Sequence, residues 1–395
     1  MPNFKADIDF DLVHKYFNGE YSCDIQTEFG FMSKEENGIS LVHANIHNKS
    51  FFIQLKKQQN HYLIKLDKHS KIDDLAVLTL ALHDFSKAFC KNIISSTLGF
   101  NKPKLSSNVV GIQELLTKIK QYKKVILEIG FGSARQLLHQ AKTNDSDTLI
   151  VGLEIYKPSI LQASKLLKEY ENVVLLNDDA RFVIDILPKG CIDLLLLHFP
   201  VPWNDSKTRR VISEEFFKNL SYVLKENAMF WLRTDDDEYF EDAKALLKDF
   251  KIDVRINEKA DIVSKYEDRW LRLEKNIYDI YATNTKDVFK EEISMSLDGI
   301  VAKKIKSCKI VGDDYFLNIE KDYEIKYFNQ TSDIWRLLPP KSVMLKISYG
   351  SFTKPFHAYI LNDRFLFNKP YFCTQNIKAL SELKKILGDS SCNHQ

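Results

Sequence analysis

The chain has 395 residues, 44% of them hydrophobic and 28% charged, with a net charge of +2. This length exceeds one ordinary core and predicts two or three domains, and the composition excludes a disordered chain. No apolar run reaches membrane-spanning length, and acidic residues interrupt the first apolar segment. The sequence therefore predicts neither a membrane protein nor a secretory leader, and we expect a cytoplasmic protein. Six scattered cysteines without a C-x-x-C pair predict reduced thiols and no zinc or other metal site.

Residues 1–100 predict an N-terminal accessory region that is rich in β-strands and contains one helix. Short apolar runs at 50–55 and 61–66 alternate with polar turns, and apolar residues at helical spacing fill residues 73–90. The turn-rich stretch 101–108, with the sequence NKPKLSSN, predicts a linker.

Residues 101–285 predict an α/β domain, because short apolar runs now alternate with amphipathic helical stretches. The expected strands are 125–129, 149–154, 173–176, 192–197, 229–232 and a closing strand at 276–283. The expected helices are 135–142, 159–170, 181–187, 214–224 and 238–249. Nearly continuous apolar strands that alternate with helices indicate a mainly parallel, Rossmann-like sheet that is covered on both faces.

Residues 286–395 predict a C-terminal accessory region that is again rich in β-strands. Strands are expected at 343–348 and 356–361, and a short helix at 376–387. With 17 basic and 13 acidic residues, this region has a net charge of +4. The excess fits contact with phosphates, and it also fits an ordinary solvated surface.

A glycine loop follows the first strand of the α/β domain in the sequence VILEIGFGSARQLL. Gly130 and Gly132 permit a tight strand-to-helix turn and a close approach of the backbone to a ligand. Glu128 precedes them, which makes the pattern E-x-G-x-G. A carboxylate suits the positive ammonium and sulfonium groups of S-adenosylmethionine, whereas it is a poor neighbour for the pyrophosphate of a dinucleotide.

The next two strands also end in acidic residues. Glu154 ends the second strand, where a carboxylate can accept hydrogen bonds from a ribose hydroxyl pair. Asp179 lies in the sequence NDDA after the third strand, beside the expected position of an adenine. Both follow the carboxyl ends of neighbouring strands, which is where doubly wound sheets bind ligands.

The fourth strand ends in the unusual sequence HFPVPWNDSKTRR. Two prolines fix the backbone around Val201 and remove N–H donors that would extend the strand. Trp203 is a candidate for stacking on a nucleobase, and also for ordinary packing. Lys207, Arg209 and Arg210 are candidates for contacts with phosphates, although they also fit an exposed turn before a helix.

Six motifs together resemble the tRNA (guanine-N7)-methyltransferase family of the bacterial type, in a long form with N- and C-terminal extensions. They are LEIGFG, GLEI, NDDA, HFPVPW, RTDDDEYF and SKYEDRW, and their order and spacing match across residues 123–283. The resemblance implies a class I S-adenosylmethionine-dependent methyltransferase fold. It also implies methyl transfer to N7 of a guanosine in tRNA, at position 46 in the variable loop.

The resemblance also implies roles for individual residues. Those assigned to the methyl donor are Glu128, Gly130, Gly132, Glu154 and Asp179. Those assigned to the tRNA are Asp235, Ser264, Lys265, Tyr266 and Glu267, together with Lys207, Arg209 and Arg210. No metal is implied, and the sequence does not predict the oligomeric state.

Four positions depart from the family pattern. Val201 replaces the aspartate of F-P-D-P-W, to which the family assigns donor binding and catalysis. Asp205 falls where a basic residue is expected, Ala134 replaces a third glycine, and Asp236 replaces a tryptophan. Guanine N7 carries no proton, so transfer needs alignment and electrostatics rather than a base. Asp205 and Asp235 are therefore the candidate catalytic residues that would stand in for the missing carboxylate.

Three alternatives remain at this point. One is a tRNA-binding protein that keeps the donor pocket but has weak or lost catalysis, which the valine at position 201 favours. Another is a Rossmann methyltransferase that acts on a small molecule or a protein. A nicotinamide-dependent dehydrogenase fits the glycine loop but not the acid that precedes it.

Overall fold

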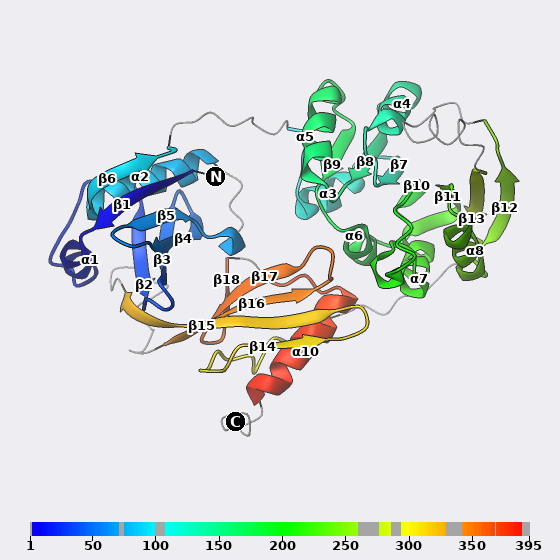
Figure 1. Cartoon of the computed structure of the whole chain (residues 1–395). Coiled ribbons are helices and arrows are strands. Elements are labelled where there is room, and N and C mark those ends of the chain that lie inside the picture. The colour runs from blue at the N-terminus through cyan, green and yellow to red at the C-terminus, as the bar shows by residue number, and fades with distance from the viewer. Residues whose placement is uncertain are drawn as a thin grey trace.

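The computed structural model describes residues 2–70, 75–98, 107–259, 276–285, 294–328, 342–367 and 369–388. Within these ranges the strands form two sheets, one built from the middle of the chain and one from its two ends (Figure 1). None of the helices in the same ranges is long and apolar enough to span a bilayer.

The middle of the chain forms a mainly parallel sheet with the strand order β12-β13-β11-β10-β7-β8-β9 over the described residues. Strands β7 to β11 pair in parallel, and β13 runs antiparallel to both β11 and β12. The strands are β7 (Lys124–Ile129), β8 (Thr148–Leu153), β9 (Val173–Leu176), β10 (Ile192–His198), β11 (Leu224–Thr234), β12 (Lys251–Ile256) and β13 (Tyr278–Thr283).

Helices cover both faces of this sheet, as the apolar strands require. Alternate residues of a strand point to opposite faces: Ile150 of β8 packs in one core with α4 and α5, whereas Leu149 and Val151 pack in another with α3, α6, α7 and α8. The helices are α3 (Ile112–Ile119), α4 (Arg135–Thr143), α5 (Lys157–Leu166), α6 (Ala180–Ile186), α7 (Glu214–Val223) and α8 (Asp237–Leu246). The predicted α/β fold with a mainly parallel sheet is confirmed.

Strands from the two ends of the chain form the second sheet, which follows the order β18-β17-β16-β15-β2-β3-β4-β5-β1-β6, with β14 paired to β15. The N-terminal strands are β1 (Asn3–Ile8), β2 (Glu28–Ser33), β3 (Ile39–Ile46), β4 (Lys49–Lys57), β5 (Tyr62–Leu66) and β6 (Cys90–Ser96). The C-terminal strands are β14 (Cys308–Val311), β15 (Phe316–Phe328), β16 (Val343–Gly350), β17 (Phe356–Leu361) and β18 (Arg364–Leu366). The helices are α1 (Phe10–Phe17), η1 (Lys68–Ser70), α2 (Leu75–Phe89) and α10 (Thr374–Gly388).

The two ends of the chain meet where β15 pairs with β2 in antiparallel register. A cluster of buried side chains crosses this junction, including Phe31 and Phe52 from the N-terminal strands and Tyr323, Met344 and Tyr359 from the C-terminal strands. Each half also packs its own helix, α2 on the N-terminal core and α10 on the C-terminal core. The two accessory regions therefore share one continuous sheet.

Candidate functional site

The predicted donor residues gather at the carboxyl ends of the parallel strands because the strands are in register. Glu128 on β7 lies opposite Gly152 on β8. The Gly130 amide donates to the carbonyl of Leu153, and the Glu154 amide donates to the carbonyl of Leu176. The three acidic loops after β7, β8 and β9 thus share one edge of the sheet.

The glycine loop has the backbone that its residues predicted. Gly130 has φ +71° and Gly132 has φ +50°, values that L side chains rarely adopt, and a Cβ at Gly130 would meet no neighbour within 4 Å. Ala134, the N-cap of α4, is also left-handed with φ +59°. A glycine would suit position 134, where the family pattern has its third glycine, because alanine is strained in this left-handed conformation.

Glu128 is a buried carboxylate beneath this loop, with a side chain that is only 4% exposed. Its Oε2 atom is buried and has no hydrogen-bond partner among the described residues. Burial raises the pKa of Glu128 to about 8, and the negative charge of Glu154 adds to the rise. An ionised Glu128 therefore lacks a positive partner, which a cationic ligand in the loop would supply.

Glu154 is less buried and organises the next loop. Its Oε2 accepts a hydrogen bond from the amide of Gly132 at 3.2 Å, and its Oε1 accepts one from the amide of Tyr156 at 2.9 Å. Asn177 donates to the backbone carbonyls of Glu154 and Ile155 at 2.8 and 2.9 Å. The loops after β7, β8 and β9 are therefore held together by side-chain hydrogen bonds.

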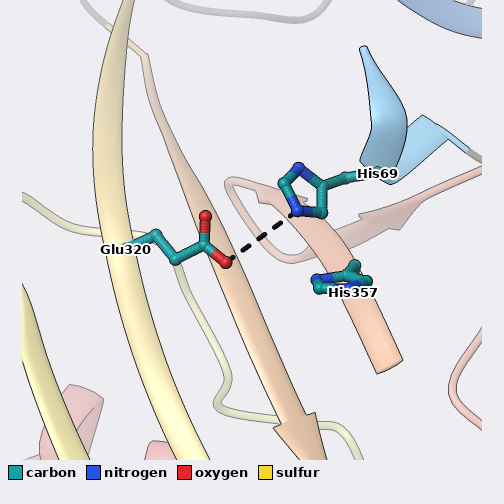
Figure 2. A group of neighbouring side chains, drawn as sticks. All are labelled: His69, Glu320 and His357. Carbon is teal, nitrogen blue, oxygen red and sulfur yellow. Dashed lines mark ion pairs between the residues drawn. The ribbon is translucent and has the colours of Figure 1, made fainter. Parts of the chain in front are cut away.

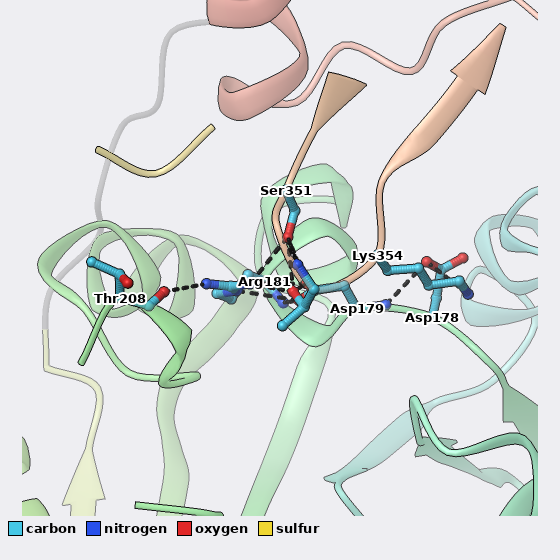
Figure 3. A network of polar contacts seen from close by, with 7 residues as sticks. Asp178, Asp179, Arg181, Thr208, Ser351 and Lys354 are labelled. Atoms are coloured by element: carbon cyan, nitrogen blue, oxygen red, sulfur yellow. Dashed lines mark hydrogen bonds and ion pairs between the residues drawn. The ribbon is translucent and has the colours of Figure 1, made fainter. Parts of the chain in front are cut away.

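Asp179 is the N-cap of α6 and lies in a polar network that includes the C-terminal region (Figure 3). Its Oδ1 accepts from the amide of Arg181, and its Oδ2 accepts from the guanidinium of Arg181 at 3.0 Å and from the hydroxyl of Ser351 at 2.9 Å. The hydroxyl of Thr353 also donates to Oδ2. Burial alone would raise the pKa of Asp179, but these charges and hydrogen bonds hold it below its usual range.

Further contacts fix the C-terminal region onto α6. Lys354 pairs with Asp178 at 3.2 Å, and the rings of Phe356 and Phe182 meet edge to face with centroids 4.8 Å apart. The amide of Thr374 at the start of α10 donates to Asp185 at 2.7 Å. We name the segment Ser351–Lys354 the clamp loop, because it holds the acidic loop that follows β9.

The turn after β10 is strained at both ends. Phe199 has φ +49° and Trp203 has φ +45°, and neither is a glycine. Between them Val201 is 62% exposed, and Trp203 is 39% exposed. Strained non-glycine residues concentrate at functional sites, and the two prolines here hold an apolar side chain out into solvent.

The three basic residues after the turn have different surroundings. Arg210 is only 3% exposed; its guanidinium donates to the carbonyl of Pro202 and to Oδ1 of Asn204 at 2.7 Å. Lys207 and Arg210 both pair with Glu238 and Asp242 on α8. Arg209 is exposed and lies over the ring of Trp203, with its Cζ 4.5 Å from the centroid. Arg210 therefore supports the turn from inside, and Arg209 is presented to solvent.

One candidate catalytic aspartate lies within this turn, and the other follows the neighbouring strand β11. Asp235 is half-buried and directly follows β11, whose residue Arg233 pairs in register with His198 at the end of β10. Asp205 is exposed within the turn itself. Asn204 donates to Asp236 at 3.1 Å and so ties the turn to the segment after β11. The predicted tRNA-contacting residues Ser264, Lys265, Tyr266 and Glu267 lie outside the described residues.

Sequence reasoning did not identify the clamp loop. Ser351 and Thr353 lie about 170 positions from Asp179, and isolated hydroxyl residues carry no recognisable pattern. It also did not single out His198, whose Nε2 is buried without a hydrogen-bond partner among the described residues. Burial lowers the pKa of His198 to about 3, with a further contribution from Arg233, so this imidazole is neutral.

Comparison with known proteins connects this geometry to a family. The model of a family described as "Putative methyltransferase" matches residues 122–280. A tRNA (guanine-N(7)-)-methyltransferase of Campylobacter jejuni subsp. jejuni serotype O:23/36 (strain 81-176) is 37% identical over 98% of each chain. One of Helicobacter pylori (strain ATCC 700392 / 26695) is 33% identical, again over 98% of each chain. A solved structure of an antibiotic-related methyltransferase is 22% identical, with a TM-score of 0.35, and matches 44% of this chain and 94% of its own.

Proposed function

This chain belongs to the tRNA (guanine-N7)-methyltransferase family, and we propose that it transfers a methyl group from S-adenosylmethionine to N7 of a guanosine in tRNA. The family resemblance assigns the target to position 46 in the variable loop. The single observation that carries the proposal is the set of acidic loops after β7, β8 and β9, which matches the chemistry of this donor.

The residues fit the methyl donor in two respects. Oε2 of Glu128 is a buried acceptor without a partner among the described residues, so the positive ammonium of the donor would satisfy it. Gly130 has open space where a side chain would otherwise stand. In this proposal Glu154 accepts hydrogen bonds from the ribose hydroxyls, because each carboxylate oxygen has a second lone pair beyond the bonds described. Asp179 lies beside the adenine and is held in place by the clamp loop.

The reaction needs positioning more than proton transfer. N7 of guanine has an in-plane lone pair and no proton, so it attacks the sulfonium methyl carbon directly and the donor leaves as a neutral thioether. The protein contributes by holding the two reactants in line and by excluding water, which supplies several kcal/mol of the barrier reduction. No residue has to act as a base before attack.

The guanine edge still needs acceptors for its N1–H and amino group, and Asp235 is the better of the two candidates. It leaves the strand next to β10 and is half-buried, whereas Asp205 is exposed in the turn. The exposed Val201 offers only apolar contact at the position where the family has its aspartate. We therefore assign base recognition to Asp235 and a secondary role to Asp205.

Contact with the tRNA backbone falls to the exposed cations near the turn. Arg209 is the best placed of these, because it is exposed and Trp203 orients it. Lys207 is exposed but already paired with two acidic side chains, so its contribution to phosphate binding requires exchange of those pairs. The proposal keeps Ser264, Lys265, Tyr266 and Glu267 as tRNA contacts on the family resemblance alone.

One assay tests the proposal directly. The purified protein is incubated with labelled S-adenosylmethionine and an unmodified tRNA transcript, and 7-methylguanosine is mapped by reduction and aniline cleavage. A single product in the variable loop is the expected result. Donor binding without transfer would instead support the tRNA-binding protein with lost catalysis, which Val201 favours. Full activity of an Asp235→Ala protein would contradict the role of Asp235.

A further inference from the structure

A second group of side chains with ligand chemistry lies outside the loops after β7, β8 and β9, at the junction of the two accessory regions (Figure 2). His69 comes from η1, Glu320 from β15 and His357 from β17. One potential ligand atom from each residue lies within 4.8 Å of the other two, and all three side chains are half-buried. Three donors from three separate elements of the chain thus converge.

Neighbouring groups orient both imidazoles. Ser348 donates its hydroxyl proton to Oε1 of Glu320, so its oxygen can only accept from Nδ1 of His357, which lies 2.9 Å away. The carboxylate of Asp67 lies 3.8 Å from Nδ1 of His69, which has no hydrogen-bond partner among the described residues. His357 thus turns Nδ1 toward Ser348 and has Nε2 as its ligand atom. Histidines that bind metals are typically held this way, with the second nitrogen turned toward a polar partner.

The described charges nearest to these residues are two carboxylates and one ammonium. The carboxylates are those of Asp67 and Glu320, and the ammonium of Lys346 lies 3.0 Å from Oε2 of Glu320. Lys346 pairs with Oε2, whereas Oε1 accepts a hydrogen bond from Ser348 and lies 4.0 Å from Nε2 of His69. An imidazole nitrogen and a carboxylate oxygen that face each other at this distance can both bind a cation placed between them.

We propose that His69, Glu320 and His357 bind a divalent transition-metal ion, with zinc as the best match to the donors. Two imidazole nitrogens and one carboxylate oxygen form a recognised zinc ligand set that leaves a fourth position for water. Bonds of about 2.1 Å place tetrahedral ligands roughly 3.4 Å apart, so the side chains must close by about 1 Å. The ion would join the N-terminal η1 to two C-terminal strands and thereby stabilise the shared sheet.

The test uses the full chain without a histidine tag, stripped with a chelator and titrated with Zn²⁺ by calorimetry and with Co²⁺ by visible absorption. We expect one ion per chain, a tetrahedral Co²⁺ spectrum, and a rise in Tm with Zn²⁺. His69→Ala and His357→Ala should each weaken binding at least ~100-fold, and Ser348→Ala by about 10- to 100-fold. His14→Ala, which removes an exposed histidine on α1, is the matched control and should bind like the wild type.

Two results would overturn the metal site. The first is a wild-type protein that binds no stoichiometric Zn²⁺. The second is unchanged affinity in both histidine variants. Glu320→Gln removes the negative charge but keeps the size of the side chain, so a folding defect is less of a concern than with an alanine variant. Far-UV circular dichroism of each variant without metal checks that it is folded. All of these readouts are independent of methyl transfer.

Discussion

The unusual pKa of Glu128 makes donor binding pH-dependent in a way that one substitution should abolish. In the free protein burial raises the pKa of this carboxyl to about 8. At pH 6 only about 1% of the protein has Glu128 ionised, and at pH 7 about 10%. A donor whose cation pairs with the carboxylate must first displace that proton. Binding at pH 6 should therefore release close to one proton, and affinity should rise about tenfold between pH 6 and pH 7.

Calorimetry at pH 6 in two buffers of different ionisation enthalpy measures the released proton directly. Glu128→Gln has no carboxyl to deprotonate at this position, so its binding of the donor should release almost no protons. Its affinity should also lose the tenfold rise between pH 6 and pH 7. Glu226→Gln, which changes an exposed glutamate in β11, is the matched control and should behave like the wild type. Equal proton release by the wild type and Glu128→Gln would refute the pairing of Glu128 with the donor.

The same carboxyl also affects the stability of the free protein. Its folded pKa of about 8 lies above its ordinary value of 4.5, so the unfolded chain loses the proton first. Stability is therefore lost as pH rises from about 4.5 to about 8, by on the order of 5 kcal/mol at most. Denaturant unfolding measures the free energy of unfolding of the wild type and of Glu128→Gln at pH 5 and pH 7.5. The loss between the two pH values should be larger for the wild type, and the difference is the contribution of Glu128.

Four further predictions concern the turn and the clamp loop. Val201→Asp should raise kcat/KM for tRNA about tenfold, since a carboxylate that contacts a base contributes roughly 1–3 kcal/mol; a loss of activity in the steady-state assay would contradict this. Ser351→Ala combined with Thr353→Val should weaken donor binding about 5- to 30-fold by calorimetry, because two hydrogen bonds to a buried carboxylate are lost. Arg210→Ala should cost about 2–3 kcal/mol of stability in denaturant unfolding, since it leaves a loop without its internal support. Arg209→Ala should instead leave the free energy of unfolding unchanged. In a plot of log K for tRNA binding against log salt concentration, it should make the slope less steep by about one.

The α/β part of the fold was predictable from the sequence because its signals are local. Each parallel strand is a short apolar run, as at β9 (Val173–Leu176), and each is followed by a polar loop and an amphipathic helix. The strand β12 (Lys251–Ile256) was missed, since charged residues interrupt it and its burial is slight. The helix α3 (Ile112–Ile119) was missed as well, because a glycine without a capping side chain precedes it.

The pairing of the accessory regions could not be predicted in the same way. β2 and β15 come from opposite ends of the chain, and nothing local in either strand identifies its partner. The same reason explains why the sequence indicated no metal site. His69 and His357 are isolated in the sequence, and only the shared sheet brings them together.

The donor residues illustrate a third limit. The position of Glu128 was predictable from its motif, but its burial depends on packing from other elements, as does the absence of a partner for its Oε2 atom among the described residues. For Arg210 the sequence predicted an exposed cation, either in contact with phosphates or in a solvated turn. The structure instead buries Arg210, which pairs with Asp242 on α8. Residue type and spacing therefore predicted which loops lie together at one edge of the sheet, whereas tertiary contacts decide which side chains in those loops are buried, paired or exposed.

The charge of the C-terminal region has an internal explanation that the sequence could not supply. Its net charge of +4 fits contact with phosphates as well as an ordinary solvated surface, and several of its cations are already paired. Lys354 holds Asp178 beside the donor loop, Lys346 holds Glu320 at the junction with the N-terminal region, and Lys378 pairs with Asp314 at 2.9 Å. Lysines engaged in this way attract tRNA less strongly than the formal charge implies. Part of the positive charge therefore serves to fix this region onto the donor loop and onto the N-terminal strands.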